Sequence, residues 1–369
     1  MKFSMKKNKL MNASSKIVGI IPKKNIKPIL SGVKIHSKDN NIYFSATDME
    51  SSMMIKVESF YLEGQGSYVI DALTLEEISK NLLKDEVHFT LEPNKTIAHT
   101  GAGEIKIPVM NADDYPELDF DNVGEEIHLP KEKIMGMIEK VLFCTSTDEM
   151  IRNLNGVLWE FSGKYLRLVS ADSYRMAVTE EVVFDEERPD LSFFLSLKSM
   201  KEIQSLLKES DEEHFTIKFD GKKVITKIKD ILFTARLMDV SFPNYKAVLP
   251  EQFQTKIIID RVEILKALKL INIIAKGKGD TVKLNIEENK LEISARSQDK
   301  GDGDIPYEIK QEGKNMLVAF DPGYLIEGLQ HFDGDELEMN FVDGNNALQI
   351  NDTEISGFLH IIMPVKIRT

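Results

Sequence analysis

The residues that could do chemistry are scattered along this 369-residue chain, and they form no recognisable catalytic set. The seven histidines stand apart, and no two of them have the HxH or HExxH spacing that brings two imidazoles to one metal ion. The one cysteine, Cys144, has no histidine close to it in the sequence, and it can form no disulfide within the chain. We therefore interpret the histidines as surface or half-buried residues, and we expect neither a metal ion nor a cofactor.

Two glycine-containing stretches and one pair of carboxylates remain as candidates. Residues 101–103 (Gly-Ala-Gly) lack the third glycine of a dinucleotide loop, and residues 276–279 (Lys-Gly-Lys-Gly) lack the frame of a P-loop. Asp113 and Asp114 lie in an acidic stretch that indicates an exposed turn. A hydrolase that uses these two carboxylates as an acid–base pair stays open as an alternative function.

The charge of the chain first argues against a general nucleic-acid binder, because the net charge is −13 and the isoelectric point is about 5.2. Sorting the charge by expected element changes this interpretation. Six windows with helical patterns carry +10 together, which leaves −23 on the remainder: residues 6–16, 72–84, 131–140, 198–208, 261–278 and 322–331. Basic helices beside acidic strands can present one positive surface to a polyanion. The alternative for any single helix is an ordinary solvated face.

The elements recur with a period close to 124 residues. A short apolar strand followed by an amphipathic helix occurs three times, and its central strand residues, Val69, Phe193 and Leu317, are 124 residues apart. Ser-Ala pairs that end apolar strands recur with spacings of 125 and 124, at residues 45–46, 170–171 and 294–295. Repeats in the same order predict three homologous domains of typical size.

The expected fold class is α+β, with two helices and several antiparallel strands in each domain. Hairpin turns are expected at residues 162–164, 220–221 and 343–345. The expected domains are residues 1–122, 127–247 and 255–369. The intervening stretches, residues 119–126 and 244–254, have the composition of short exposed connections.

Several motifs together resemble one known family. They are residues 156–160 (GVLWE), 166–178 (LRLVSADSYRMAV), 242–250 (FPNYKAVLP), 361–365 (IIMPV), 1–3 (MKF) and 27–30 (KPIL). In this order, and over essentially the whole chain, they are similar to the bacterial sliding clamps, the β subunits of DNA polymerase III.

The resemblance implies a non-enzymatic protein without cofactors that acts in the cytoplasm, on the nucleoid. Two chains would join head to tail in a homodimeric ring of six domains, with helices lining the hole and sheets outside. The ring would encircle double-stranded DNA without reading its sequence and act as a processivity factor. A hydrophobic pocket would take short peptides of the replicative polymerase, the clamp loader, mismatch repair proteins and ligase.

The resemblance also carries site residues over to this chain. The partner-peptide pocket would include Leu154, Ala171, Ser173, Tyr174, Arg175, Met176, Pro243, Val248, Tyr324, Ile361, Ile362, Met363, Pro364 and Val365. DNA contacts would come from Lys24, Arg152, Asn153 and Lys198. The seam between the two chains would bring Ile105 and Ile107 to Ile273 and Ile274. From periodicity alone, Met176, Val248 and Ile362 would be interpreted as core residues.

This chain departs from the family pattern at the pocket and at the seam. Ser173-Tyr174 replaces the usual Gly-His, and Ala247 stands where arginine is common. These changes bear on which peptides are preferred. At the seam, only His99 and Lys106 stand where the family has a cluster of arginines, so an apolar seam is expected. A scaffold that is built from repeats and binds only proteins is the second alternative function.

Overall fold

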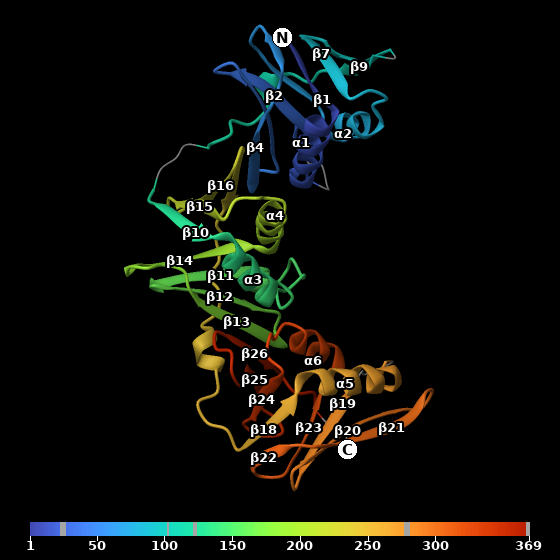
Figure 1. Ribbon diagram of the computed structural model, residues 1–369, viewed down its shortest axis with the longest axis vertical. Helices are drawn as coiled ribbons and strands as arrows, with labels where there is room; N and C mark the ends of the chain where they lie inside the picture. The colour runs from blue at the N-terminus through green and yellow to red at the C-terminus, as the bar shows by residue number, and fades with distance from the viewer. Residues whose placement is uncertain (23–26, 102, 121–123, 277–280, 367–369) are drawn as a thin grey trace. The chain divides into compact units, whose positions relative to one another are not determined.

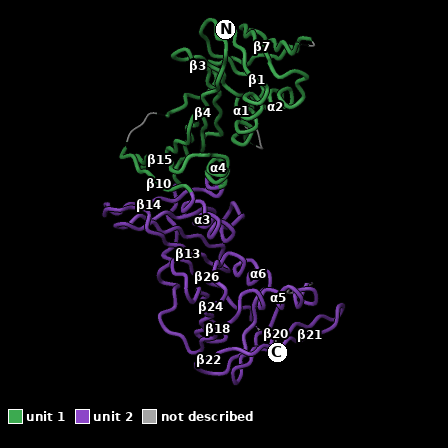
Figure 2. Tube along the Cα trace, viewed as in Figure 1, with its two compact units in different colours: residues 1–131, 201–237 green, residues 132–200, 238–369 purple. Residues whose placement is uncertain are grey.

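The computed structural model describes residues 1–22, 27–101, 103–120, 124–276 and 281–366. These residues fold as two compact units (Figure 2). Unit 1 contains Met1–Lys131 and Lys201–Leu237, and unit 2 contains Glu132–Met200 and Met238–Thr369. Each unit combines two antiparallel sheets with helices, which confirms the expected α+β class (Figure 1). Within the described ranges, no helix is long and apolar enough to cross a membrane.

Unit 1 contains a five-stranded and an eight-stranded sheet. The five strands, in pairing order, are β5 (Tyr61–Glu63), β1 (Lys2–Lys6), β7 (Glu86–Glu92), β8 (Lys95–His99) and β9 (Glu104–Pro108). The eight strands are β10 (Glu126–Pro130), β15 (His214–Phe219), β16 (Lys223–Ile228), β17 (Ile231–Arg236), β4 (Ser51–Val57), β3 (Asn41–Thr47), β2 (Gly32–Lys38) and β6 (Ser67–Asp71). Strand β9 is therefore an edge of its sheet.

Unit 2 contains a nine-stranded and a four-stranded sheet. The nine strands are β14 (Arg188–Ser196), β11 (Gly156–Gly163), β12 (Tyr165–Ala171), β13 (Arg175–Val182), β26 (Phe358–Ile362), β25 (Leu348–Asp352), β24 (Glu336–Phe341), β18 (Thr255–Asp260) and β22 (Lys310–Gly313). The four strands are β21 (Gly301–Glu308), β20 (Lys290–Ser297), β19 (Val282–Glu287) and β23 (Met316–Phe320). Strand β21 is an edge of its sheet.

All six expected helices are confirmed, with ends within a few residues of the sequence windows. They are α1 (Lys7–Ile20), α2 (Ala72–Asn81), α3 (Lys131–Leu142), α4 (Leu197–Lys208), α5 (Arg261–Ala275) and α6 (Pro322–Leu329). Three begin at an aspartate whose carboxylate accepts a backbone N–H of the first turn: Asp71 at α2, Asp260 at α5 and Asp321 at α6. The expected hairpins are present between β11 and β12, β15 and β16, and β24 and β25.

Each of the two large sheets is completed by strands from neighbouring repeats. In unit 1, β17 pairs with β4 antiparallel over five residue pairs, with Phe233 opposite Met53. In unit 2, β13 pairs with β26 over five residue pairs, with Met176 opposite Ile361. We call these the first junction and the second junction. Each one extends a sheet from one repeat into the next.

The hairpin turns beside the two junctions are the same turn, 124 residues apart. Met49 and Ser173 both adopt left-handed backbone conformations, with φ of 77° and 79°. Asp48 N–H donates to the Ser51 carbonyl at 3.1 Å, and Asp172 N–H donates to the Arg175 carbonyl at 3.1 Å. This equivalence places Ala171 at the position of Thr47, so the Ser-Ala alignment at 45–46 and 170–171 was shifted by one residue.

The stretch 244–254 is not simply an exposed connection, because it contains the short 3₁₀ turn η4 (Tyr245–Val248). Tyr245 is only 6% exposed and packs in an apolar cluster on the nine-stranded sheet. The polar composition predicted a solvated linker, but one aromatic side chain and its neighbours fasten it to the sheet. The predicted linker at 119–126 lies partly outside the described residues, and β10 begins at Glu126.

Candidate functional site

A rigid hairpin turn between β12 and β13 forms one side of the candidate site. The Asp172 carboxylate accepts the backbone N–H groups of Tyr174 and Arg175, each at 3.1 Å. Ser173 takes the left-handed conformation that the turn requires. The turn leaves the Tyr174 ring 59% exposed, where it stacks on Tyr324 of α6 with ring centroids 6.0 Å apart.

Arg175 fastens this hairpin to α6. Its guanidinium donates to Asp172 at 2.9 Å, to Glu327 at 2.6 Å and to the Phe143 carbonyl at 2.9 Å. The guanidinium carbon also lies 4.6 Å from the centroid of the Tyr324 ring, within cation–π range. The side chain is 8% exposed, so its donors serve contacts inside the protein. The geometry therefore supports a positioning role for Arg175, whereas the resemblance implied contact with the peptide.

An apolar cluster lies beside the turn, on the second junction. It contains Val169, Met176, Val178, Tyr245, Ala347 and Ile361, with Leu158, Ala171, Phe242, Leu249 and Leu359 packed against it. Met176 and Ile361 form a directly opposed strand pair, and Ala171 is opposite Met176 on the other side. The structure thus brings three of the expected pocket residues into one apolar surface.

Backbone hydrogen bonds connect several of the other expected pocket residues to neighbouring segments. Met363 donates its N–H to the Tyr174 carbonyl at 2.7 Å, and Val365 donates to the Ala319 carbonyl at 2.7 Å. The carbonyls of Leu154 and Ala171 both accept from Ser146 N–H, at 3.1 and 3.3 Å. The expected residues that are exposed are Ser173, Tyr174, Pro243, Val248, Met363 and Val365, and Pro364 is half-buried. Ile362 is 0% exposed and Met176 is 4% exposed, so both are buried as periodicity alone predicts, whereas Val248 is 60% exposed.

The segment of residues 242–250 is held over the sheet by Tyr245. Its hydroxyl donates to Glu160 at 2.5 Å and accepts from the Arg167 guanidinium at 3.2 Å. Burial raises the pKa of Tyr245 to about 12, and its hydrogen bond to Glu160 acts in the same direction. The phenol therefore stays protonated at neutral pH and keeps this donor.

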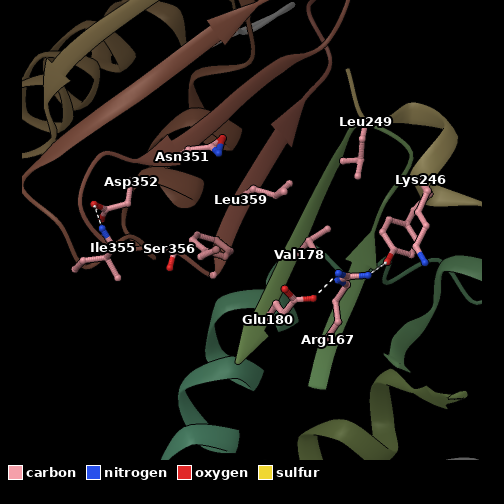
Figure 3. Close-up of a pocket in the computed structure, with 13 residues that line it drawn as sticks. Arg167, Val178, Glu180, Lys246, Leu249, Asn351, Asp352, Ile355, Ser356 and Leu359 are labelled. Carbon is pink, nitrogen blue, oxygen red and sulfur yellow. Dashed lines mark hydrogen bonds and ion pairs between the residues drawn. The ribbon is translucent and has the colours of Figure 1, made fainter. Parts of the chain in front are cut away.

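A cavity of about 520 Å³ adjoins the cluster in unit 2 (Figure 3). Figure 3 shows Val178 and Leu359 between Leu249 on one side and the loop that carries Ile355 and Ser356 on the other. None of these residues was expected in the site. The available signal was strand alternation, since Val178 lies two residues after Met176 and so on the same face.

Contacts within the protein use several of the helix charges that sequence analysis assigned to a polyanion. Lys9 lies 2.8 Å from Glu58, Lys16 pairs with Glu209, and Lys140 lies 2.6 Å from Asp333. On α4 and α5, the side chains of Lys198, Lys201, Lys266 and Lys269 are exposed. The basic surface is therefore narrower than the helix charges alone predict.

The expected DNA contacts are placed as follows. Arg152 and Asn153 lie on an exposed 3₁₀ turn, and the Arg152 guanidinium is 2.6 Å from the Asp239 carboxylate. Lys198 is exposed at the second residue of α4. Lys24 lies outside the described residues. Arg152 and Lys198 thus both lie at the surface of the protein, and Arg152 forms an ion pair with Asp239.

The four expected seam residues differ in exposure. Ile105 on β9 is 40% exposed and Ile273 on α5 is 60% exposed, whereas Ile107 is 2% exposed. Ile274 is half-buried and lies near β21, where a Cβ added to Gly303 would be 3.9 Å from it. The surface available for a second chain therefore comes from Ile105 and Ile273.

The structure places the residues considered for catalysis as follows. Cys144 lies 3.7 Å from His360 Nδ1, a proximity that the sequence did not reveal. Burial raises the pKa of the Cys144 thiol, and burial lowers the pKa of His360 to about 3, so neither group is charged at neutral pH. Asp113 and Asp114 lie in an exposed 3₁₀ turn. Among the described residues, no three His, Cys, Asp or Glu side chains gather as a metal site would require.

Comparisons with known proteins agree with this architecture. Three sequence models of the DNA polymerase III beta subunit match in order: the N-terminal domain over residues 1–119, the central domain over 128–244 and the C-terminal domain over 246–366. The beta sliding clamp of Bacillus subtilis is 26% identical, over 99% of this chain and 100% of its own.

Solved structures of the same family superpose over the full length. The DNA polymerase III beta subunit of Thermotoga maritima is 35% identical with a TM-score of 0.92, and each chain is covered completely. The sliding clamp of Pseudomonas aeruginosa bound to griselimycin has a TM-score of 0.92 at 20% identity, again over both chains completely. The chain belongs to the DNA polymerase III beta subunit family.

Proposed function

We propose that this protein is a DNA sliding clamp, a processivity factor that encircles duplex DNA and tethers the replicative polymerase. As a member of its family it is a non-catalytic subunit that binds DNA and polymerase. The apolar cluster on the second junction gives the tether a physical basis, since it can bury the anchor side chains of a short peptide.

The two strand junctions within the chain support the proposal of a closed ring. Strands β4 and β13 hold equivalent places in their repeats, and β17 and β26 are the edges with which they pair. The equivalent strands that remain are β21 and β9, and each is the edge of its sheet within the described chain. A third junction between β21 of one chain and β9 of another would repeat the same pairing, and two such junctions would close a homodimer of six repeats.

Exposed leucines support a seam at these strands. On the helix side of the second junction, Lys140, the tenth residue of α3, pairs with Asp333. The tenth residue of α5 is Leu270, which is 59% exposed and is equivalent to Lys140. The residue equivalent to Asp333 is Leu83, because each directly follows a buried apolar residue, Phe332 or Leu82. Leu83 is 81% exposed. Apolar side chains thus replace the ion pair where a second copy would dock. We assign Ile105, Ile273, Leu270 and Leu83 to the seam.

The other assignments follow from the same proposal. DNA phosphates would be met by Lys198 and the exposed lysines of α5, with Arg152, Asn153 and Lys24 as further contacts. The peptide site would be built on Ala171, Met176, Ile361, Val248 and Met363. The three repeats would be bounded as residues 1–122, 127–247 and 255–369. We propose the clamp loader, mismatch repair proteins and ligase as further partners, and the cytoplasmic nucleoid as the place of action.

Retention on circular DNA tests the proposal. The protein is loaded onto a nicked circular plasmid with its clamp loader and ATP, and is then separated from free protein by gel filtration at moderate salt. A ring that encircles DNA stays with the circle and leaves after a single restriction cut. Equal retention on circular and linear DNA, or none on either, would contradict the proposal.

A further inference from the structure

We infer that the partner-binding site extends into the neighbouring cavity, which takes a second apolar side chain of the same partner segment. The inference rests on the proposed function, because the anchor of that segment is assumed to bind at Met176 and Ile361. It adds a subsite whose floor is Val178 and Leu359 and whose walls are Leu249 and Ile355.

The anchor site and the proposed subsite lie on neighbouring residue pairs of the same two strands, β13 and β26. Met176 is opposite Ile361, and two residues further along Val178 is opposite Leu359. All four side chains belong to the same apolar cluster or pack against it. Alternate residues of a strand share a face and rise by about 3.3 Å each, so the second floor lies roughly 6.6 Å beyond the first. An extended peptide that follows the strands would reach it with the side chain two residues from its anchor.

The two subsites also share a wall. Tyr245 and Leu249 pack in or against the apolar cluster that contains Met176 and Ile361, and both also line the cavity. Figure 3 shows Leu249 and Lys246 on the side of the cavity opposite the loop of Ile355 and Ser356. The volume of about 520 Å³ is within the range of pockets that bind small ligands. The cavity therefore borders the anchor site directly, through the residues that both contain.

Two polar side chains of the cavity, Arg167 and Asp352, are held by neighbouring groups. The Arg167 guanidinium donates to the Glu180 carboxylate, and it also donates to the Tyr245 hydroxyl at 3.2 Å. The Asp352 carboxylate accepts the N–H groups of Gly334 and Ile355, at 2.7 and 2.9 Å. These bonds fix the two ends of the cavity and leave its apolar floor to select the ligand.

Lys246 adds a preference at the rim. Its side chain is 60% exposed, and its ammonium lies 3.7 Å from Glu160, a long and weak ion pair. An acidic residue after the apolar one would approach this ammonium, whereas a basic residue would be repelled. The expected occupant is thus an extended peptide segment. Its anchor residue is followed, toward the cavity, by any residue, then an apolar residue and then an acidic residue.

Peptide-length variants test the inference. The probe is a fluorescent peptide of the clamp-binding segment of the cognate replicative polymerase, ending at its anchor residues, with three-residue extensions at either end. Extension by Ala-Leu-Asp in one direction should tighten binding by about fivefold to tenfold over Ala-Ala-Asp, because one leucine becomes buried. Extension by Ala-Leu-Lys should gain less. No leucine-dependent gain in either direction would overturn the inference.

Two surface variants locate the gain. Ile355→Asp and Ser356→Trp should abolish the gain from the leucine and leave the affinity of the unextended peptide unchanged. Leu317→Asp serves as the matched control for Ile355→Asp. Leu317 is 47% exposed and Ile355 is 43% exposed, and Leu317 does not line the cavity. A gain that survives both cavity variants would overturn the subsite. Failure of the unextended peptide to bind would instead count against the proposed function.

Discussion

The first and second junctions share one backbone design. In both, five residue pairs join two repeats, and the bond beyond the last pair is the same: Lys56 N–H to the Asp230 carbonyl at 2.9 Å, and Glu180 N–H to the Gly357 carbonyl at 2.6 Å. A lysine of one helix also meets an acid near the end of another at each junction: Lys16 with Glu209, and Lys140 with Asp333.

The side chains beside the turns distinguish the two junctions. At the first, Ser52 is opposite Thr234, and the Ser52 hydroxyl donates to Thr47 at 2.9 Å. At the second, the positions equivalent to Ser52 and Thr47 carry Met176 and Ala171. The hydroxyls at the first junction bond to one another, whereas the methionine and alanine at the second junction pack in or against the apolar cluster. Under the proposed function, the peptide site differs from the first junction by side-chain replacement on the same backbone frame.

The largest expected effect comes from giving the second junction the serine of the first. Met176→Ser should weaken binding of the polymerase peptide at least about 30-fold and lower the free energy of unfolding by roughly 2–3 kcal/mol, because a buried methionine is lost and a cavity is left. Fluorescence anisotropy and urea denaturation measure the two effects. Met54→Ser, at the first junction, is the control and should leave peptide affinity intact. Unchanged peptide affinity in Met176→Ser would show that the second junction is not the site.

Acid should weaken the second junction through His360. This residue of β26 is fully buried, and burial, followed by the charge of Arg175, lowers its pKa to about 3 from an ordinary value of 6.5. The unfolded chain therefore binds a proton between these values when the folded chain does not, and stability falls as pH drops below about 6.5. The loss from this group should reach about 2 kcal/mol at pH 5.

Urea denaturation at pH 7 and pH 5 measures this slope, and His360→Gln should flatten it. His36 on β2 in unit 1 is a second contributor, since burial and then Lys34 and Lys38 lower its pKa to about 4. His36→Gln separates the two. A slope that His360→Gln leaves unchanged would contradict the assignment to the second junction.

The smallest expected effect concerns the two equivalent turns. Met49→Gly and Ser173→Gly should each raise the free energy of unfolding by about 0.5 kcal/mol. Glycine adopts the left-handed conformation without steric strain, and the greater conformational entropy of glycine in the unfolded chain cancels only part of this gain. Thermal unfolding of the two variants gives the comparison. If the turns are the same device, the two gains agree. A loss in either variant would mean that the side chain at that turn stabilises the fold.

Much of the fold could be predicted because local signals repeat. The six helices follow from apolar periodicity and from polar starts such as Asp71 and Asp321, and the hairpins follow from glycine positions such as Gly163 and Gly221. Strand pairing between repeats could not be predicted in this way. It depends on which edges meet, and periodicity within a strand carries no information about that.

The candidate site was predictable to the extent that it follows motifs. The pairing of β13 with β26 places the hairpin of residues 171–176 beside residues 361–365 in unit 2. Periodicity alone predicted the burial of Ile362, whereas the resemblance placed this residue in the pocket. The burial of Arg175 was not predicted, because the partners of its guanidinium are set by tertiary packing. The cavity beside Val178 was missed for the same reason, since Ile355 is far from it in the sequence.

Sedimentation equilibrium of the full-length protein at micromolar concentration tests the central claim most directly, namely that β9 and β21 form a third junction between two chains. The account predicts a mass twice the 41.9 kDa of one chain. It also predicts that Leu83→Glu shifts the protein toward the single-chain mass and that Leu270→Lys added to it restores dimer, by rebuilding the ion pair of the internal junctions. A wild-type mass of 41.9 kDa would contradict the account.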